Sequence, residues 1–109
     1  MKQTNLEFNV AFKVFLSTAH AQVATMTLAS GETVGGSDNL HQSSAQWLFV
    51  VSGRGEATVA GHTIKLEPHT LCVIEAGEPH EISNTGGAPL ETLNFYVPPE
   101  YRQQLFTLS

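Results

Sequence analysis

Residues 71–84 read LCVIEAGEPHEISN, and this stretch decides the fold class. The short apolar run Leu71–Ile74 ends at a turn-forming sequence, residues 76–79 (AGEP), and a second short segment runs from His80 to Asn84. Short apolar runs bounded by Gly and Pro are typical of β-strands. The stretch therefore predicts two strands joined by a turn, with His80 at the start of the second strand.

The same pattern recurs along most of the chain. Phe8, Val10, Phe12 and Val14 alternate with other residues, which predicts a strand over residues 8–15 with one buried face. Turn formers at residues 30–32 and 35–39 interrupt the pattern. Further strands are expected at residues 22–28, 46–51, 56–60, 63–66 and 90–97, and one short helix at residues 100–108. The sequence predicts a single all-β domain over residues 1–109.

Composition excludes several classes of function. The chain has 109 residues and a net charge of −5, and its five Lys and Arg residues are scattered, which argues against a nucleic-acid partner. It has no basic amphipathic helix and no apolar run long enough to span a bilayer, so no membrane partner is expected. The single cysteine, Cys72, and the absence of a signal-peptide pattern at the N-terminus predict a cytoplasmic protein.

Two segments resemble the conserved motifs of the cupin family. Residues 31–53 are similar to the first motif, with His41 at one of its histidine positions, Asn39 at the other and Gln46 at its glutamate position. Residues 69–84 are similar to the second motif, in which Gly77, His80 and Asn84 match, whereas residues 69 and 75 depart from it. The resemblance implies an antiparallel double-stranded β-helix, a jelly-roll barrel.

In cupins these motif positions bind a divalent metal. The resemblance therefore implies a site formed by Asn39, His41, Gln46 and His80. Asn39 and Gln46 offer neutral oxygens where the family has an imidazole and a carboxylate, which would weaken metal binding. Zn, Ni, Mn or Fe are candidate ions, and no organic cofactor is expected. The alternative stays open that Gln46 only forms a hydrogen bond inside the barrel.

Strand alternation extends the site to a pocket and an outer face. If Gln46 points inward, so do Leu48 and Val50, while Trp47, Phe49 and Val51 point outward. The predicted pocket residues are Leu48, Val50, Ile82 and Asn84. The outward apolar residues need a cover, either the N-terminal strand or a second copy of the chain, and they predict a homodimer.

Two functions are favoured by this sequence, and a third, a purely structural dimer in a regulatory role, stays open. The first is binding of a small-molecule ligand of unknown identity in the barrel, with or without a divalent metal. The second is a metal-dependent enzyme of the dioxygenase, isomerase or decarboxylase type, acting on a small oxygen-rich metabolite. No residue stands out as a general base, although a glutamate or Tyr96 near the barrel mouth is a candidate.

Overall fold

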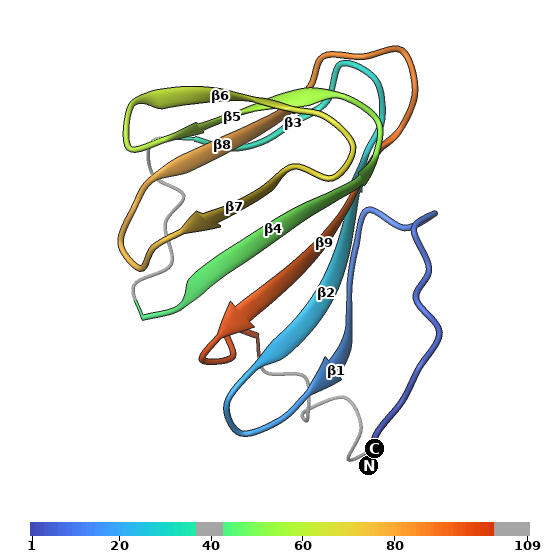
Figure 1. Ribbon diagram of the computed structural model, residues 1–109, viewed down its shortest axis with the longest axis vertical. Helices are drawn as coiled ribbons and strands as arrows, with labels where there is room; N and C mark the ends of the chain where they lie inside the picture. Colours follow the sequence, from blue (N-terminus) through green and yellow to red (C-terminus); the bar gives the residue numbers. More distant parts are fainter. Residues whose placement is uncertain (37–42, 102–109) are drawn as a thin grey trace.

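The computed structural model describes residues 1–36 and 43–101. Within these residues the chain forms nine strands and no helix, and the strands build two sheets that pack face to face (Figure 1). The five-stranded sheet has the order β1-β2-β9-β4-β7, and the four-stranded sheet has the order β3-β8-β5-β6. The strands are β1 (Phe12–Ser17), β2 (Gln22–Leu28), β3 (Thr33–Gly36), β4 (Ala45–Ser52), β5 (Gly55–Val59), β6 (His62–Leu66), β7 (Leu71–Ile74), β8 (His80–Asn84) and β9 (Leu90–Val97).

All strand pairs are antiparallel, and the prediction of an all-β jelly-roll is confirmed. Both sheets contribute inward-facing side chains to one apolar core. Leu48 and Val50 come from the five-stranded sheet, and Ala57 and Ile82 come from the four-stranded sheet. All four are at most 1% exposed, which is the burial expected for a packed interior.

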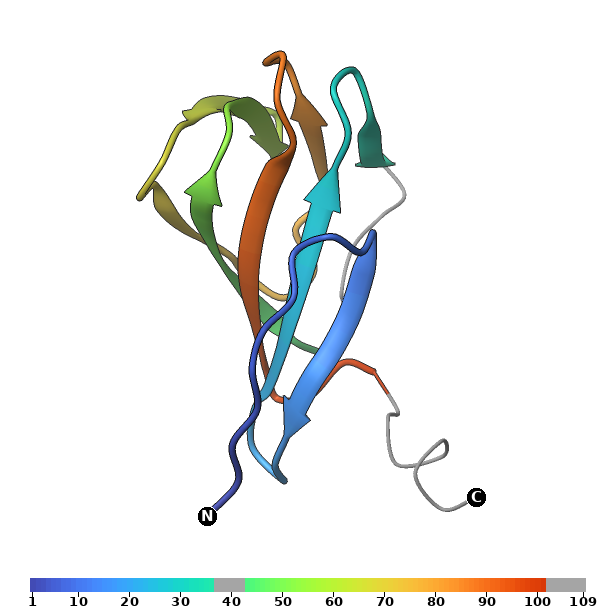
Figure 2. The same cartoon turned by 90° about the vertical axis from the view of Figure 1, so that its right-hand side faces the viewer.

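The N-terminal strand is shorter than predicted. It begins at Phe12 rather than Phe8, and its pairing with β2 is irregular between Val14 and Leu16. The preceding segment lies against the outward side of β2, where the Thr25 hydroxyl donates to the Glu7 carbonyl oxygen (2.7 Å). Figure 2 shows residues 1–8 running along the strands. A period of two alone does not distinguish a strand from a segment laid over a sheet, so the prediction was wrong here.

Two further predictions differ from the structure or fall outside it. Residues 33–36, of which the last two were expected to be part of a turn, form β3, and Gly36 pairs with His80. Gly35 has a φ of 88°, a left-handed conformation that glycine adopts at little cost, so these glycines are compatible with an edge strand. The predicted terminal helix falls mainly on residues 102–109, outside the described residues.

The outer face of the five-stranded sheet is apolar. Trp47 of β4 lies directly across from Val73 of β7 on one side and from Phe95 of β9 on the other. Their exposed fractions are 44%, 39% and 38%. Hydrogen bonds from Thr25 and Thr27 hold the N-terminal segment over β2, so the segment covers the β2 part of this outer face.

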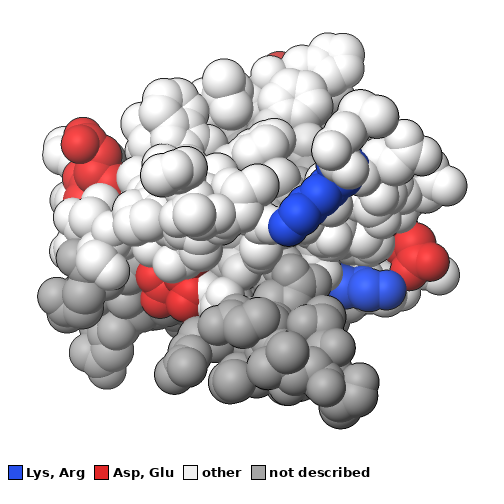
Figure 3. All heavy atoms as spheres, turned by 90° about the horizontal axis from the view of Figure 1, so that it is seen from below, with Lys and Arg blue, Asp and Glu red and all other residues white. Residues whose placement is uncertain are grey.

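Charged side chains are sparse on the described surface seen from below. In this view the few Lys and Arg side chains are separated by uncharged ones (Figure 3). None of the described residues belongs to a helix that is long and apolar enough to cross a membrane.

Candidate functional site

A cavity of about 290 Å³ lies at one end of the barrel, between the two sheets. Both sheets contribute to its wall, together with the loop before β1 and the segment after β9. The wall is mostly apolar, with a few polar side chains among the apolar ones, as in many ligand sites. Its lining residues are Ala11, Phe12, Met26, Thr27, Leu28, Glu32, Val34, Gln46, His80, Ile82, Tyr96 and Tyr101.

His80 enters this cavity from the first position of β8 and is 5% exposed. A hydrogen bond closes the turn before it, in which the Glu75 N–H donates to the Glu78 carboxylate (2.8 Å). His80 Nδ1 lies 3.1 Å from the Glu78 carbonyl oxygen. A carbonyl oxygen only accepts, so Nδ1 bears the hydrogen, and in the neutral ring Nε2 is the accepting nitrogen.

Gln46 reaches the same cavity from β4 and is 2% exposed. It ends a chain of hydrogen bonds that crosses three neighbouring strands. The Thr92 hydroxyl donates to the Met26 carbonyl oxygen (2.8 Å), and Asn94 Nδ2 donates to Thr92 Oγ1 (3.0 Å). Gln46 Nε2 then donates to Asn94 Oδ1 (2.9 Å).

This chain of hydrogen bonds has one direction. The Met26 carbonyl oxygen can only accept, so Thr92 must donate to it, and each later group donates to the one before. The last atom is Gln46 Oε1, which is buried and accepts no hydrogen bond from the described residues. A buried acceptor without a donor costs about 1–3 kcal/mol, so Gln46 brings an unmet need for a donor to the cavity.

Three aromatic rings, those of Phe12, Tyr96 and Tyr101, form another part of the wall. The Tyr101 ring lies 4.9 Å from Phe12 and 5.1 Å from Tyr96, between ring centres. Burial raises the pKa of Tyr96 far above its ordinary value of 10, and the neighbouring Tyr101 raises it further. A side-chain hydrogen bond between the two tyrosines raises the pKa of Tyr96 and lowers that of Tyr101, as expected if Tyr96 donates.

Gln22 holds Tyr101 in this position. Its Nε2 donates to the Tyr101 carbonyl oxygen (2.6 Å) and its Oε1 accepts from the Tyr101 N–H (2.9 Å). Oε1 also accepts from the Glu100 N–H (3.2 Å), and Nε2 donates to Ser17 Oγ (2.9 Å). Gln22 is completely buried, so the segment after β9 is attached to the sheet by a fully bonded amide.

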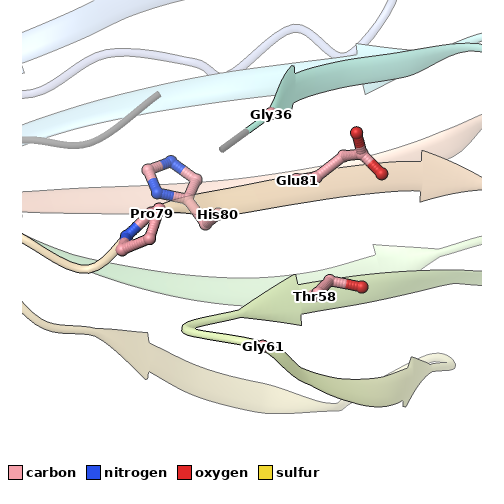
Figure 4. A pocket seen from close by; sticks show the side chains of 6 residues that line it. All are labelled: Gly36, Thr58, Gly61, Pro79, His80 and Glu81. Carbon is pink, nitrogen blue, oxygen red and sulfur yellow. The ribbon is translucent and has the colours of Figure 1, made fainter. Parts of the chain in front are cut away.

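A second, more open hollow of about 240 Å³ lies beside the first, at the end of the four-stranded sheet. Gly36, Thr58, Gly61, Pro79, His80 and Glu81 line it (Figure 4). The figure shows the His80 ring and the Glu81 carboxylate leaving β8 in different directions. His80 therefore contributes to both hollows, whereas Glu81 is exposed.

The structure brings two of the four residues proposed as metal ligands, Gln46 and His80, to one cavity. The other two, Asn39 and His41, lie outside the described residues. Among the described residues no group of three or more His, Cys, Asp and Glu side chains is placed to hold a metal ion. One imidazole and one neutral amide do not by themselves make a site for Zn, Ni, Mn or Fe, which take more protein ligands.

The predicted pocket residues lie in three places. Ile82 lines the cavity, and Leu48 and Val50 belong to the apolar core. Asn84 lies at the far end of β8, where its Nδ2 donates to the carbonyl oxygens of Leu28 and Ala88, both at 2.8 Å, and its Oδ1 accepts from the Gly86 N–H. This asparagine holds loop backbone in place.

Phe12, Tyr101 and Gln22 were not predicted from the sequence as parts of the site. Phe12 was expected only as a residue of the N-terminal strand, and Tyr101 fell in the predicted helix. The sequence did contain one sign that Gln22 has a structural role. Gln22 is a large polar residue at the start of the strand QVATMTL, and the structure buries this strand almost throughout. Its partner Tyr101 is 79 residues away along the chain, too far for local patterns to connect them.

The family model of the cupin domain matches residues 24–96. The chain belongs to the cupin family. Among curated proteins, this cupin is similar to an uncharacterised protein, YrkC, of Bacillus subtilis. The two are 31% identical over 100 residues, which cover 85% of this chain and 53% of the relative. The chain thus spans about half the length of that relative.

Solved structures agree on the fold. The cupin described here is similar to a Bacillus halodurans protein, with a TM-score of 0.80, 26% identity and coverage of 84% of this chain and 73% of the other. It is also similar to a predicted oxalate decarboxylase of Thermotoga maritima, with a TM-score of 0.73 and 25% identity. That likeness covers 81% of this chain and 79% of the other.

Proposed function

We propose that this cupin binds a small molecule in the cavity between its two sheets. The observation that supports this most strongly is Gln46, a buried amide on the cavity wall whose oxygen accepts nothing from the described residues. Buried polar groups in folded proteins are almost always paired, and an exception needs a reason. A ligand that donates to Gln46 supplies that reason.

The rest of the wall supports the same proposal. Apolar residues such as Met26, Val34 and Ile82 can cover the body of a ligand, while His80, Tyr96 and Tyr101 place a few polar groups among them. A volume of about 290 Å³ suits a metabolite-sized molecule.

A metal-dependent enzyme is the second candidate. The place of His80 on the cavity wall and the likeness to a predicted oxalate decarboxylase favour it. A bound ion would need His41 and Asn39 to join His80 and Gln46, and it would supply Lewis-acid chemistry to a substrate in the cavity. The described residues alone do not complete such a site.

Blocking the cavity tests the first candidate. Val34 lines it from β3, and the neighbouring Thr33 is exposed on the same strand. We expect fragments found by ligand-observed NMR to bind Val34→Phe at least about tenfold more weakly than wild type, because the new ring fills their space. Thr33→Phe is the matched control and should bind like wild type. Equal binding to Val34→Phe would refute the proposal.

Elemental analysis tests the second candidate. Protein purified without added metal, and protein supplemented with Zn, Ni, Mn or Fe and then dialysed, are compared with His80→Ala treated in the same way. One equivalent of metal that is lost in His80→Ala would favour the enzyme. Absence of metal from wild type after each supplementation would leave small-molecule binding as the remaining candidate.

We also propose that the apolar outer face of the five-stranded sheet pairs with the same face of a second copy. The N-terminal segment is bonded to β2 through Thr25 and Thr27, which leaves Trp47, Val73 and Phe95 exposed. A face of this kind can match itself across a two-fold axis, the commonest symmetry of soluble dimers.

The cytoplasm is the proposed location, a reducing compartment that suits a chain whose one cysteine is Cys72.

A further inference from the structure

We propose that the cavity takes an uncharged molecule with an apolar body and a hydrogen-bond donor, a hydroxyl or an amide N–H, placed against Gln46 Oε1. This inference rests on the proposed function, because it names the class of ligand for the same cavity. It follows from three properties of the wall: the direction of its hydrogen bonds, its charge and its apolar lining.

The direction of the hydrogen bonds makes the contact at Gln46 an accepting one. Turning the Gln46 amide round would set its oxygen against Asn94 Oδ1, two acceptors in the place of a 2.9 Å hydrogen bond. Turning Asn94 as well would require Thr92 to stop donating to the Met26 carbonyl oxygen. Each hydrogen bond therefore fixes the orientation of the next side chain. Gln46 Oε1 remains an acceptor, so the ligand must supply the donor.

The charge of the wall argues for an uncharged ligand. Among the described lining residues there is no Lys or Arg, and Glu32 is the only acidic one. The Glu32 side chain is exposed, and its Oε1 already accepts from the Ala29 N–H (2.6 Å). A carboxylate in the cavity would lose water without gaining a Lys or Arg partner, which is costly, and it would also set an acceptor against Gln46.

The apolar lining sets the body of the ligand. Met26, Leu28 and Ile82 belong to the buried core, and Val34 packs against it. These side chains offer contact area but no hydrogen bonds, so a molecule polar on every side would lose hydration there. A compact hydrocarbon or aromatic body with one donor at its end meets both parts of the wall.

Three probes that share one ring test the inference on the wild-type protein. Cyclohexanol has a donor, methoxycyclohexane has the oxygen without the hydrogen, and cyclohexanecarboxylate has a negative charge. We expect cyclohexanol to bind about fivefold to tenfold more tightly than the ether in NMR titrations, the usual gain from one hydrogen bond between neutral groups. The carboxylate should bind at least about tenfold more weakly than the alcohol.

The variant Gln46→Leu removes the acceptor. Its affinities for the alcohol and the ether should become equal, within about twofold, while the ether still binds. If the ether or the carboxylate binds wild type as well as the alcohol does, the inference fails and the proposed function stands. If none of the three binds although other fragments enter the cavity, the inference also fails alone. If no fragment binds there at all, both fail.

Discussion

Gln46 and Asn94 depend on each other inside the five-stranded sheet. Asn94 is completely buried and passes the chain of hydrogen bonds from Thr92 to Gln46. Gln46 has one unpaired atom already, so the two residues contribute unequally to stability. At the scale of single residues, Asn94 stabilises the fold, whereas Gln46 is the residue proposed to bind the ligand.

The first prediction compares these two residues. Asn94→Leu leaves both ends of the Gln46 amide without partners, and the free energy of unfolding should fall by about 1–3 kcal/mol. Gln46→Leu removes the unpaired oxygen and leaves only Asn94 Oδ1 without its donor, so its net cost should be close to zero. Urea unfolding of both variants measures the difference. A larger loss in Gln46→Leu than in Asn94→Leu would contradict this account.

The second prediction concerns Tyr96 at alkaline pH. Burial raises the pKa of its phenol in the folded state far above the ordinary value of 10, which the unfolded chain retains. The unfolded state therefore loses this proton first, and the free energy of unfolding should fall as the pH rises above about 10. The contribution is fully present below that pH.

Urea unfolding of wild type and Tyr96→Phe between pH 8 and about 11 measures this effect. The variant lacks the ionisable group, so its stability should decline less steeply across the alkaline range. Equal slopes for the two proteins would mean that Tyr96 is not kept protonated by the fold.

At the scale of elements, the segment after β9 closes one part of the cavity because Gln22 binds it. Tyr101 is attached through its backbone, by donation to and from the Gln22 amide, and its ring contacts Phe12 and Tyr96. The third prediction is that Gln22→Ala releases this segment while the barrel stays folded.

Hydrogen exchange measures this release. The amides of Glu100 and Tyr101, which donate to Gln22, should exchange at least about tenfold faster in Gln22→Ala, because each loses its acceptor. Gln3→Ala is the control, since residue 3 is exposed. Unchanged protection of Tyr101 in Gln22→Ala would show that ring packing alone holds the segment.

The elements also show how far the sequence predicts this molecule. Strands β2, β7, β8 and β9 match the expected residue ranges, because each has a regular apolar pattern between clear turn signals. β3 was not expected, since its glycines read as a turn. The motifs predicted His80 and Gln46 on one wall, but the hydrogen bonds from Met26 to Gln46 depend on the register of β2, β9 and β4, which no single strand encodes.

At the scale of the whole molecule, the outer face of the five-stranded sheet predicts a homodimer. The fourth prediction is that the wild-type protein sediments as a dimer and that Trp47→Lys sediments as a monomer, because a charge at the centre of the paired face would be buried without a partner. Ile64→Lys is the control, since Ile64 is 39% exposed on the other sheet and Trp47 is 44% exposed.

Sedimentation velocity at several protein concentrations separates the outcomes. A monomeric wild type would refute the pairing, and a dimer that persists in Trp47→Lys would place the interface elsewhere. Neither result would affect the cavity, because Trp47, Val73 and Phe95 do not line it.

The central claim, that the cavity between the sheets binds a small uncharged donor, is tested most directly by a crystal structure of the protein soaked with cyclohexanol. The alcohol should lie between Met26, Val34 and Ile82, with its hydroxyl oxygen about 2.8 Å from Gln46 Oε1. An alcohol bound only on the outer face of the five-stranded sheet, or bound in the cavity with its hydroxyl away from Gln46, would contradict it.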